Sequence, residues 1–413
     1  METFGKYQLL ERISSSQRVE VFLGRQASTK TTPRALVIKR LKPQAADDEA
    51  YHRAVRRAAE AAASLEHPGI ALIEGFGSID EQPYVARRYV PGKDLRTLLR
   101  RHTVQRRQLP LPLAIHLVGS LCEVLSYAHD ETPHGCLTPS DVVIDFDGNV
   151  RVINFGMGSY WARLVSGGVT IPKDKARFLA PEQVEQGTLD TRVDLFALGL
   201  ILYELLTGKP ALPDGLTSAT LRQLRAEGPP PAPSSIRSAI PAELDRVTFK
   251  ALEVAPDRRY QRPDDLARAL APFEQGSRDD LGLLMKRIFG NEALLEKQRE
   301  ELVATGRASA IPVEPELAED ENEEGEQVDA PSSPSGRPSA AAQWIGLIAV
   351  ALLGLTVYLL LKERPAPGVP AATRQDAPVM RLDSAPDAAK ERPGGDPAGD
   401  LAGGGHDTAP ASH

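Results

Sequence analysis

Hydrophobic and polar residues alternate through the first forty positions in a pattern that predicts β-strands. Residues 7–24 contain two alternating runs on either side of a serine-rich turn, and residues 36–39 form an apolar run that ends in Lys39. A two-residue period predicts an antiparallel hairpin followed by a buried strand. Apolar residues recur at helical spacing through residues 113–129, which predicts a long buried helix. A further helix is expected at residues 48–65, ending before His67-Pro68. A strand-rich part followed by a helix-rich part is typical of the α+β class.

The last part of the chain has a different pattern. Residues 276–306 carry leucines among Lys, Arg and Glu, which predicts an amphipathic helical extension that either packs on the helix-rich part or docks a partner. Residues 307–339 are acidic and then rich in Pro and Ser, and residues 362–413 are rich in Ala, Pro, Gly and Asp, so both are expected to be disordered. Residues 340–361 contain no charge. At about 1.5 Å per residue they would cover roughly 30 Å, which predicts a transmembrane helix.

Two observations disagree on the orientation of this span. Lys362 and Arg364 follow it and only Arg337 closely precedes it, a charge balance that favours a cytoplasmic C terminus. The first residues lack the charged-then-apolar pattern of a signal peptide, so export of the large first domain is not expected. We give the second argument more weight. It places the first domain in the cytoplasm, the span in the inner membrane as a single pass, and the short tail outside.

Charge and cysteine content narrow the range of partners. The 413 residues contain 49 Lys and Arg against 56 Asp and Glu, a formal net charge of −7. Nucleic-acid binding usually needs a basic field, so no nucleic-acid partner is expected. Cys122 and Cys136 are the only cysteines, and their spacing predicts neither a disulfide framework nor a zinc site. We therefore expect protein partners and, through residues 340–361, the membrane.

The candidate chemistry lies in a series of short motifs. Their order and spacing resemble those of the bacterial eukaryotic-type (Hanks-type) serine/threonine protein kinase family over residues 4–275. The resemblance implies a bilobal fold with a small β-rich N-lobe and a large helical C-lobe. The motifs that carry it are Leu36-Val37-Ile38-Lys39, His134-Gly135-Cys136-Leu137-Thr138-Pro139-Ser140-Asp141, Asn154-Phe155-Gly156, Ala180-Pro181-Glu182 and Pro256-Asp257-Arg258-Arg259.

The positions that carry catalysis in this family are degenerate here. By the resemblance, Cys136 replaces the catalytic aspartate and Thr138 replaces a lysine. Asp141 stands for a metal-binding asparagine, and Asn154 replaces the aspartate that is the main magnesium ligand. A neutral amide is a weaker magnesium ligand than a carboxylate, so Asp141 alone keeps an anionic oxygen. Lys175 replaces a threonine that usually contacts the catalytic loop, and we expect no intact catalytic site.

The nucleotide-binding positions are also altered. Ser14 and Ser16 stand where the resemblance places glycines that approach the phosphates, although an ordinary hairpin without a ligand explains the same pattern. Lys39 matches the phosphate-binding lysine, but Ala58 replaces its glutamate partner, and a solvated surface lysine is the alternative. Arg87 matches the gatekeeper position, where it would fill the adenine pocket unless it extends to solvent or pairs with a carboxylate. No cofactor is expected.

Three residues that the resemblance assigns to internal contacts are kept. Asp194 would brace the catalytic loop, and Arg259 would pair with Glu182. We therefore predict a membrane-tethered pseudokinase that acts as a scaffold or regulator by binding proteins, including active kinases or their substrates. Two alternatives stay open: an atypical serine/threonine kinase that uses ATP because Asp141, with Asp145, rescues magnesium binding, and a nucleotide sensor without catalysis.

Overall fold

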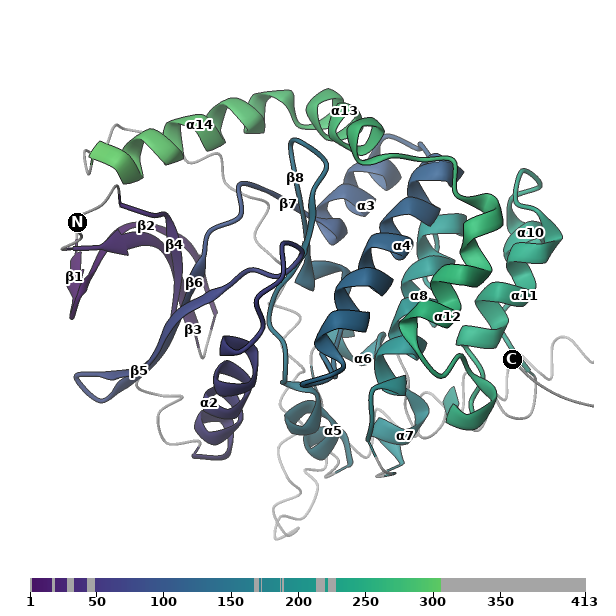
Figure 1. Ribbon diagram of the computed structural model, residues 1–413, viewed down its shortest axis with the longest axis horizontal. Helices are drawn as coiled ribbons and strands as arrows, with labels where there is room; N and C mark the ends of the chain where they lie inside the picture. Colours follow the sequence, from purple (N-terminus) through teal and green to yellow (C-terminus); the bar gives the residue numbers. More distant parts are fainter. Residues whose placement is uncertain are drawn as a thin grey trace, which may run out of the picture. The chain divides into compact units, whose positions relative to one another are not determined.

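The computed structural model describes a large part of the chain up to residue 305, and these residues form a strand-rich lobe and a helix-rich lobe (Figure 1). The predicted linker, membrane span and tail lie outside the described residues, so their predictions remain untested. The described ranges are 2–16, 19–27, 33–42, 49–166, 171, 173–185, 187, 189–212, 220–221 and 228–305.

The first lobe is built on a six-stranded sheet in the order β1-β2-β3-β4-β6-β5, with antiparallel neighbours. The predicted hairpin is present and slightly longer than expected, since Tyr7 pairs with Gln26 at its open end. Helix α2 (Glu49–Ala63) contacts the sheet at β5. The strands are β1 (Glu2–Phe4), β2 (Tyr7–Ser15), β3 (Val19–Gln26), β4 (Leu36–Leu41), β5 (Ile73–Ile79) and β6 (Gln82–Arg88).

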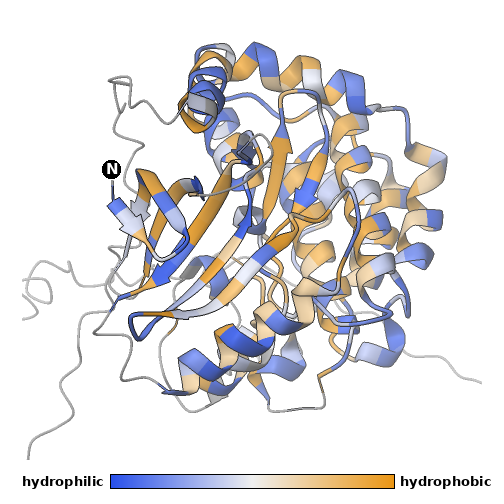
Figure 2. Ribbon diagram, turned by 60° about the vertical axis from the view of Figure 1, so that its left-hand side comes forward, coloured by the Kyte–Doolittle hydropathy of each residue, from blue (hydrophilic) through white to orange (hydrophobic). Residues whose placement is uncertain are grey.

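The second lobe is mainly helical, and its core includes the apolar helices α4 and α8, which pack on each other. Figure 2 shows hydrophobic residues on the helices of this lobe. A small sheet in the order β7-β8-β9 borders it. Its elements are β7 (Gly92–Asp94), α3 (Leu95–Val104), α4 (Leu111–Ala128), β8 (Val142–Asp145), β9 (Val150–Val152), α5 (Gly158–Ser166), α6 (Lys173–Ala176), α7 (Pro181–Val184), α8 (Arg192–Thr207), α10 (Pro233–Ile236), α11 (Ala242–Ala251) and α12 (Pro263–Leu270).

Helix α4 is the one helix in the described ranges whose length and composition would allow it to cross a membrane. It packs on α8 and α12 and belongs to the core of the second lobe. Its apolar character is therefore explained by burial between helices.

Two further helices, α13 (Arg278–Ile288) and α14 (Gly290–Thr305), follow the second lobe. Phe289 separates them. Helix α13 contacts α4 and β8 of the second lobe. Helix α14 instead runs back over the first lobe (Figure 1), where its arginine and glutamate side chains find partners. Packing on the helix-rich part, as expected for the extension, therefore describes α13, whereas α14 contacts both lobes.

Candidate functional site

The loop before Cys136 is held in place by one buried carboxylate of α8. Asp194 is fully buried and accepts hydrogen bonds from the backbone N–H groups of His134, at 2.8 Å, and Gly135, at 2.7 Å. His129 Nε2 lies 2.9 Å from the same carboxylate. Three partners around one carboxylate fix the path of the loop, since a buried carboxylate needs its full set of hydrogen bonds.

Cys136 lies in an apolar environment formed by the segment that follows Asn154. Its side chain is 4% exposed and clusters with Ile171 and Leu179, while Trp161 of α5 packs against the same cluster. Burial raises the pKa of the Cys136 thiol to about 12. A thiol that stays protonated at neutral pH cannot accept a proton from a hydroxyl group, so position 136 cannot act as a general base.

Both carboxylate oxygens of Asp141 are occupied by side chains of the protein. Asn154 donates from Nδ2 to Asp141 Oδ1 at 2.9 Å. Lys175 Nζ lies 3.0 Å from Asp141 Oδ2, and the Thr138 hydroxyl and backbone N–H donate to that same oxygen at 2.7 and 3.1 Å. Four degenerate positions of the sequence, 138, 141, 154 and 175, therefore form one connected hydrogen-bonded group.

The pair of Lys175 and Asp141 is ionised and largely shielded from water. Asp141 is 1% exposed and Lys175 is 19% exposed. Burial is the largest single effect on Lys175 and opposes its charge, but Asp141, with smaller contributions from Cys136 and Asp174, outweighs it and raises the Lys175 pKa well above its usual value. Burial is likewise the largest single effect on Asp141 and opposes its charge, but Lys175, His134, Asn154 and Thr138 together outweigh it and hold the Asp141 pKa below its usual value. Each group thus supplies the counter-charge that the other needs inside the protein.

A magnesium ion does not fit this arrangement. Magnesium prefers anionic oxygen ligands, yet the one anionic group at the site is already satisfied by an ammonium group, a hydroxyl group and two amide groups. Asp145 does not add a second ligand, because its carboxylate binds Asn149 and Arg151. Among the described ranges there is also no group of three His, Cys, Asp or Glu side chains able to hold a metal.

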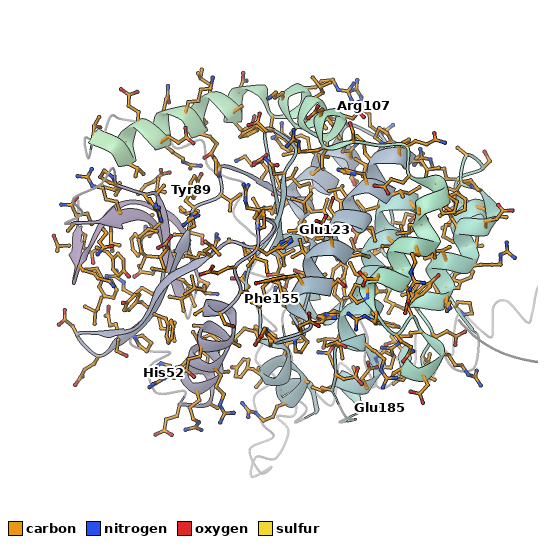
Figure 3. The ribbon with its side chains drawn as sticks, in the orientation of Figure 1. His52, Tyr89, Arg107, Glu123, Phe155 and Glu185 are labelled. Atoms are coloured by element: carbon orange, nitrogen blue, oxygen red, sulfur yellow. The ribbon has the colours of Figure 1, made fainter. Side chains whose placement is uncertain are left out.

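The α2 position expected to carry a glutamate is closed by tight packing. Ala58 is 6% exposed, and a Cβ atom added to Gly156 would lie 2.8 Å from the Ala58 Cα atom. Gly156 has a φ of +88°, which favours glycine. Phe155 is buried beside it and packs on the His134 ring at 4.8 Å (Figure 3). The turn after Asn154 therefore occupies the space that a longer side chain at position 58 would need.

Arg87 is partly buried at the end of the first lobe. It lies on β6 with Val37 and Ile73 as its neighbours on the flanking strands. Burial lowers the pKa of Arg87 to about 10, and the charges of Tyr89 and Asp141 act in the opposite direction. Within the described ranges Arg87 forms no ion pair with a carboxylate. The expected alternative in which Arg87 pairs with an acidic side chain is therefore not observed among these residues.

The remaining predicted positions are distributed around this site. Lys39 lies on β4, opposite Val21 of β3 and Val85 of β6. Arg259 is fully buried and donates to both oxygens of Glu182, each at 2.7 Å. The Glu182–Arg259 pair links α7 to the loop before α12.

Sequence reasoning missed the contact between Lys175 and Asp141. It treated the lysine as the loss of a threonine and the aspartate as a free metal ligand. Relative to the family pattern, Asp141 replaces a neutral asparagine and Lys175 replaces a neutral threonine. That pair of opposite charge changes was the available signal for a direct ion pair.

Comparisons with known proteins agree with the bilobal fold. Residues 7–267 match the protein kinase domain family. The chain is 30% identical over 319 residues to the tyrosine-protein kinase MasK of Myxococcus xanthus, covering 74% of this chain and 49% of MasK. It is 30% identical over 254 residues to the serine/threonine-protein kinase PknB of Mycobacterium leprae, covering 59% of this chain and 39% of PknB. The chain thus spans about half the length of these relatives or less.

A solved structure has the same fold. The kinase domain of PknI from Mycobacterium tuberculosis superposes with a TM-score of 0.53 at 25% identity, covering 67% of this chain and 98% of that one. The similarity to MasK covers more of the chain than the kinase match does. Since few residues precede Tyr7, that similarity has to continue into α13 and α14.

Proposed function

The chain belongs to the protein kinase domain family of bacterial Hanks-type serine/threonine kinases, and we propose that it is a pseudokinase, a member that does not transfer phosphate. The observation that carries the proposal is the Lys175 ammonium group, 3.0 Å from the Asp141 carboxylate. The ammonium group of Lys175 thus binds the carboxylate that, by the family pattern, would otherwise be a ligand of the metal ion. Asn154 directs its amide N–H at the other oxygen of Asp141, which removes the second position for metal coordination.

The loss of rate expected from these changes is large. Phosphoryl transfer depends on metal ions that neutralise charge on the phosphates and on a residue that receives the hydroxyl proton. Loss of a general base typically removes about 10²–10⁴ in rate, and loss of one electrostatic group about 10²–10³. The two losses need not multiply. Starting from roughly 1–100 per second for kinases, little turnover should remain.

The role we propose is a scaffold or regulator in signalling, with active kinases or their substrates as protein partners. It is supported by the contrast between a closed metal position and intact internal contacts at Asp194 and Arg259. The uncharged residues 340–361 would tether the domain to the inner membrane, with the domain in the cytoplasm and the short tail outside. This placement rests on the sequence pattern.

The proposal predicts how the chain responds to ATP and magnesium. We expect the thermal midpoint of the wild-type chain to be the same with ATP alone and with ATP plus magnesium, because no carboxylate is available for the ion. In a variant that combines Lys175→Thr with Asn154→Asp, two carboxylates become available, and we expect a magnesium-dependent rise of a few degrees. Differential scanning fluorimetry, with and without magnesium or manganese, measures both.

The control is the same double variant with Asp141→Ala added, which removes the ligand at position 141 and should lose the magnesium response. A magnesium-dependent shift in the wild-type chain would contradict the proposal and favour the atypical kinase. A shift with ATP that does not depend on metal would instead favour the nucleotide sensor, in which Lys39 would contact the phosphates. If the double variant does not fold, direct titration of the wild-type chain with manganese still decides between these outcomes.

A further inference from the structure

Helix α14 connects the two lobes through contacts along its whole length. It begins at the second lobe, where Glu292 binds Arg101 of α3 at 2.7 Å. It ends at the first lobe, where Arg25 of β3 donates to the Val303 carbonyl at 2.8 Å. Figure 1 shows the helix passing over the segment that joins the lobes, on the side away from α2. A single helix is thus fixed at one end to each lobe.

The centre of α14 binds the connecting segment itself. The Tyr89 hydroxyl donates to Glu296, which is 3% exposed (Figure 3 labels Tyr89). Arg299 donates to Glu296 at 2.8 Å and to both oxygens of Glu11 on β2, at 2.9 and 3.2 Å. Hydrogen bonds among four side chains therefore link the connecting segment, through α14, to the first lobe.

These contacts are of a kind that contributes strongly to stability. Burial, together with the nearby Glu296 carboxylate, raises the Tyr89 pKa well above its usual value, so the phenol stays a donor at all physiological pH values. Arg299 is 21% exposed and Glu11 is 16% exposed. Solvent therefore screens only partly the two-pronged ion pair, or fork, that Arg299 forms with Glu11. Leu302 and Val303 add apolar burial at 5% and 3% exposure. The helix therefore has side-chain and backbone hydrogen-bond anchors on the first lobe, and Leu302 and Val303 in its last turn are buried.

We infer that α14 is a detachable clamp that fixes the angle between the lobes. Kinase-like lobes move about the segment that joins them, and here that motion has to break the contact between Tyr89 and Glu296 or the fork between Arg299 and Glu11. The chain continues directly from the first-lobe end of the clamp at Thr305. A partner that binds the chain beyond Thr305, or a force applied there, would detach the end of α14 from the first lobe first. The angle between the lobes could then change, and with it the surface that the two lobes form together. This inference holds whether or not the domain transfers phosphate.

Hydrogen–deuterium exchange on the full chain tests the clamp. We expect Arg299→Ala to increase amide exchange by about tenfold or more in α14, in β2 and in residues 88–92, because it removes a partly buried charged fork. Exchange in α8, which the clamp does not touch, should stay unchanged. Lys297→Ala, an exposed cation of the same helix, is the matched control and should change none of these regions.

Two results would overturn the inference. One is unchanged exchange in residues 88–92 when α14 itself exchanges faster, which would mean that the helix does not restrain the lobes. The other is an equal increase in α8, which would mean general destabilisation. If Arg299→Ala fails to fold, Glu11→Gln weakens the same fork from the first lobe and gives the same comparison.

Discussion

Replacing Lys175 with methionine is expected to lower the free energy of unfolding by about 3–5 kcal/mol, because it leaves the Asp141 carboxylate buried without its counter-charge. Asp141 is 1% exposed and cannot turn to water. The remaining donors, Thr138 and Asn154, are neutral and cannot replace a positive charge. Urea denaturation followed by circular dichroism measures the loss.

The pH dependence of this loss has a definite sign. In the wild-type chain Lys175 holds the Asp141 pKa below its usual value, so the pair stabilises the fold above the unfolded-state pKa, about 3.9, and this stability is lost as pH falls through the lower folded-state pKa. In Lys175→Met burial should raise the Asp141 pKa, so the variant gains stability as pH falls. The difference should be largest near pH 7 and shrink toward about pH 4.5.

The exposed Lys209 offers a matched control. Lys209→Met should change the unfolding free energy by less than about 0.5 kcal/mol. A similarly small effect for Lys175→Met would mean that the ion pair contributes little and that Asp141 is free to take other partners.

Replacing Arg259 with methionine is expected to cost at least as much. The guanidinium group is fully buried and forms two hydrogen bonds with Glu182, each at 2.7 Å. It also donates to the backbone carbonyls of Arg192, Glu253 and Val254, at 3.0, 2.7 and 3.0 Å. Its loss leaves a buried carboxylate without its counter-charge and removes three hydrogen bonds to backbone carbonyls, which should lower the unfolding free energy by about 4 kcal/mol or more.

The neighbouring Arg258 is exposed, so Arg258→Met is a matched control for Arg259→Met. Arg258→Met should leave the urea midpoint nearly unchanged, whereas Arg259→Met should yield little soluble protein or a much lower midpoint. Equal midpoints for the two variants would show that the Glu182–Arg259 pair does not hold this part of the fold together.

Much of the fold could be predicted from the chain because its signals are local. The helix expected at residues 113–129 is α4 (Leu111–Ala128), since a period of apolar residues buries one face against neighbouring helices. The hairpin at residues 7–24 follows from alternation and a serine-rich turn. What could not be predicted was the docking of α14. Its leucine spacing indicates a helix, but Arg299 and its partner Glu11 are 288 positions apart.

The sequence indicated which residues stand at the candidate site but not how these residues contact one another. The motifs identified which positions had changed, and they left Asp141 as a free metal ligand. Lys175 lies 34 positions later, and its contact with Asp141 depends on the path of the segment between Asn154 and Ala180, which no local pattern determines. The changes at 141, 154 and 175 are therefore better described as the exchange of an external cation for an internal one than as separate losses.

This exchange is tested most directly by a phosphotransfer assay on the purified full chain with labelled ATP, magnesium or manganese, and a general protein acceptor. The account predicts no transfer above background, and the same background for wild type and for Asp141→Ala. Transfer by the wild-type chain would contradict it, and loss of that transfer in Asp141→Ala would show that Asp141 holds a metal and not Lys175.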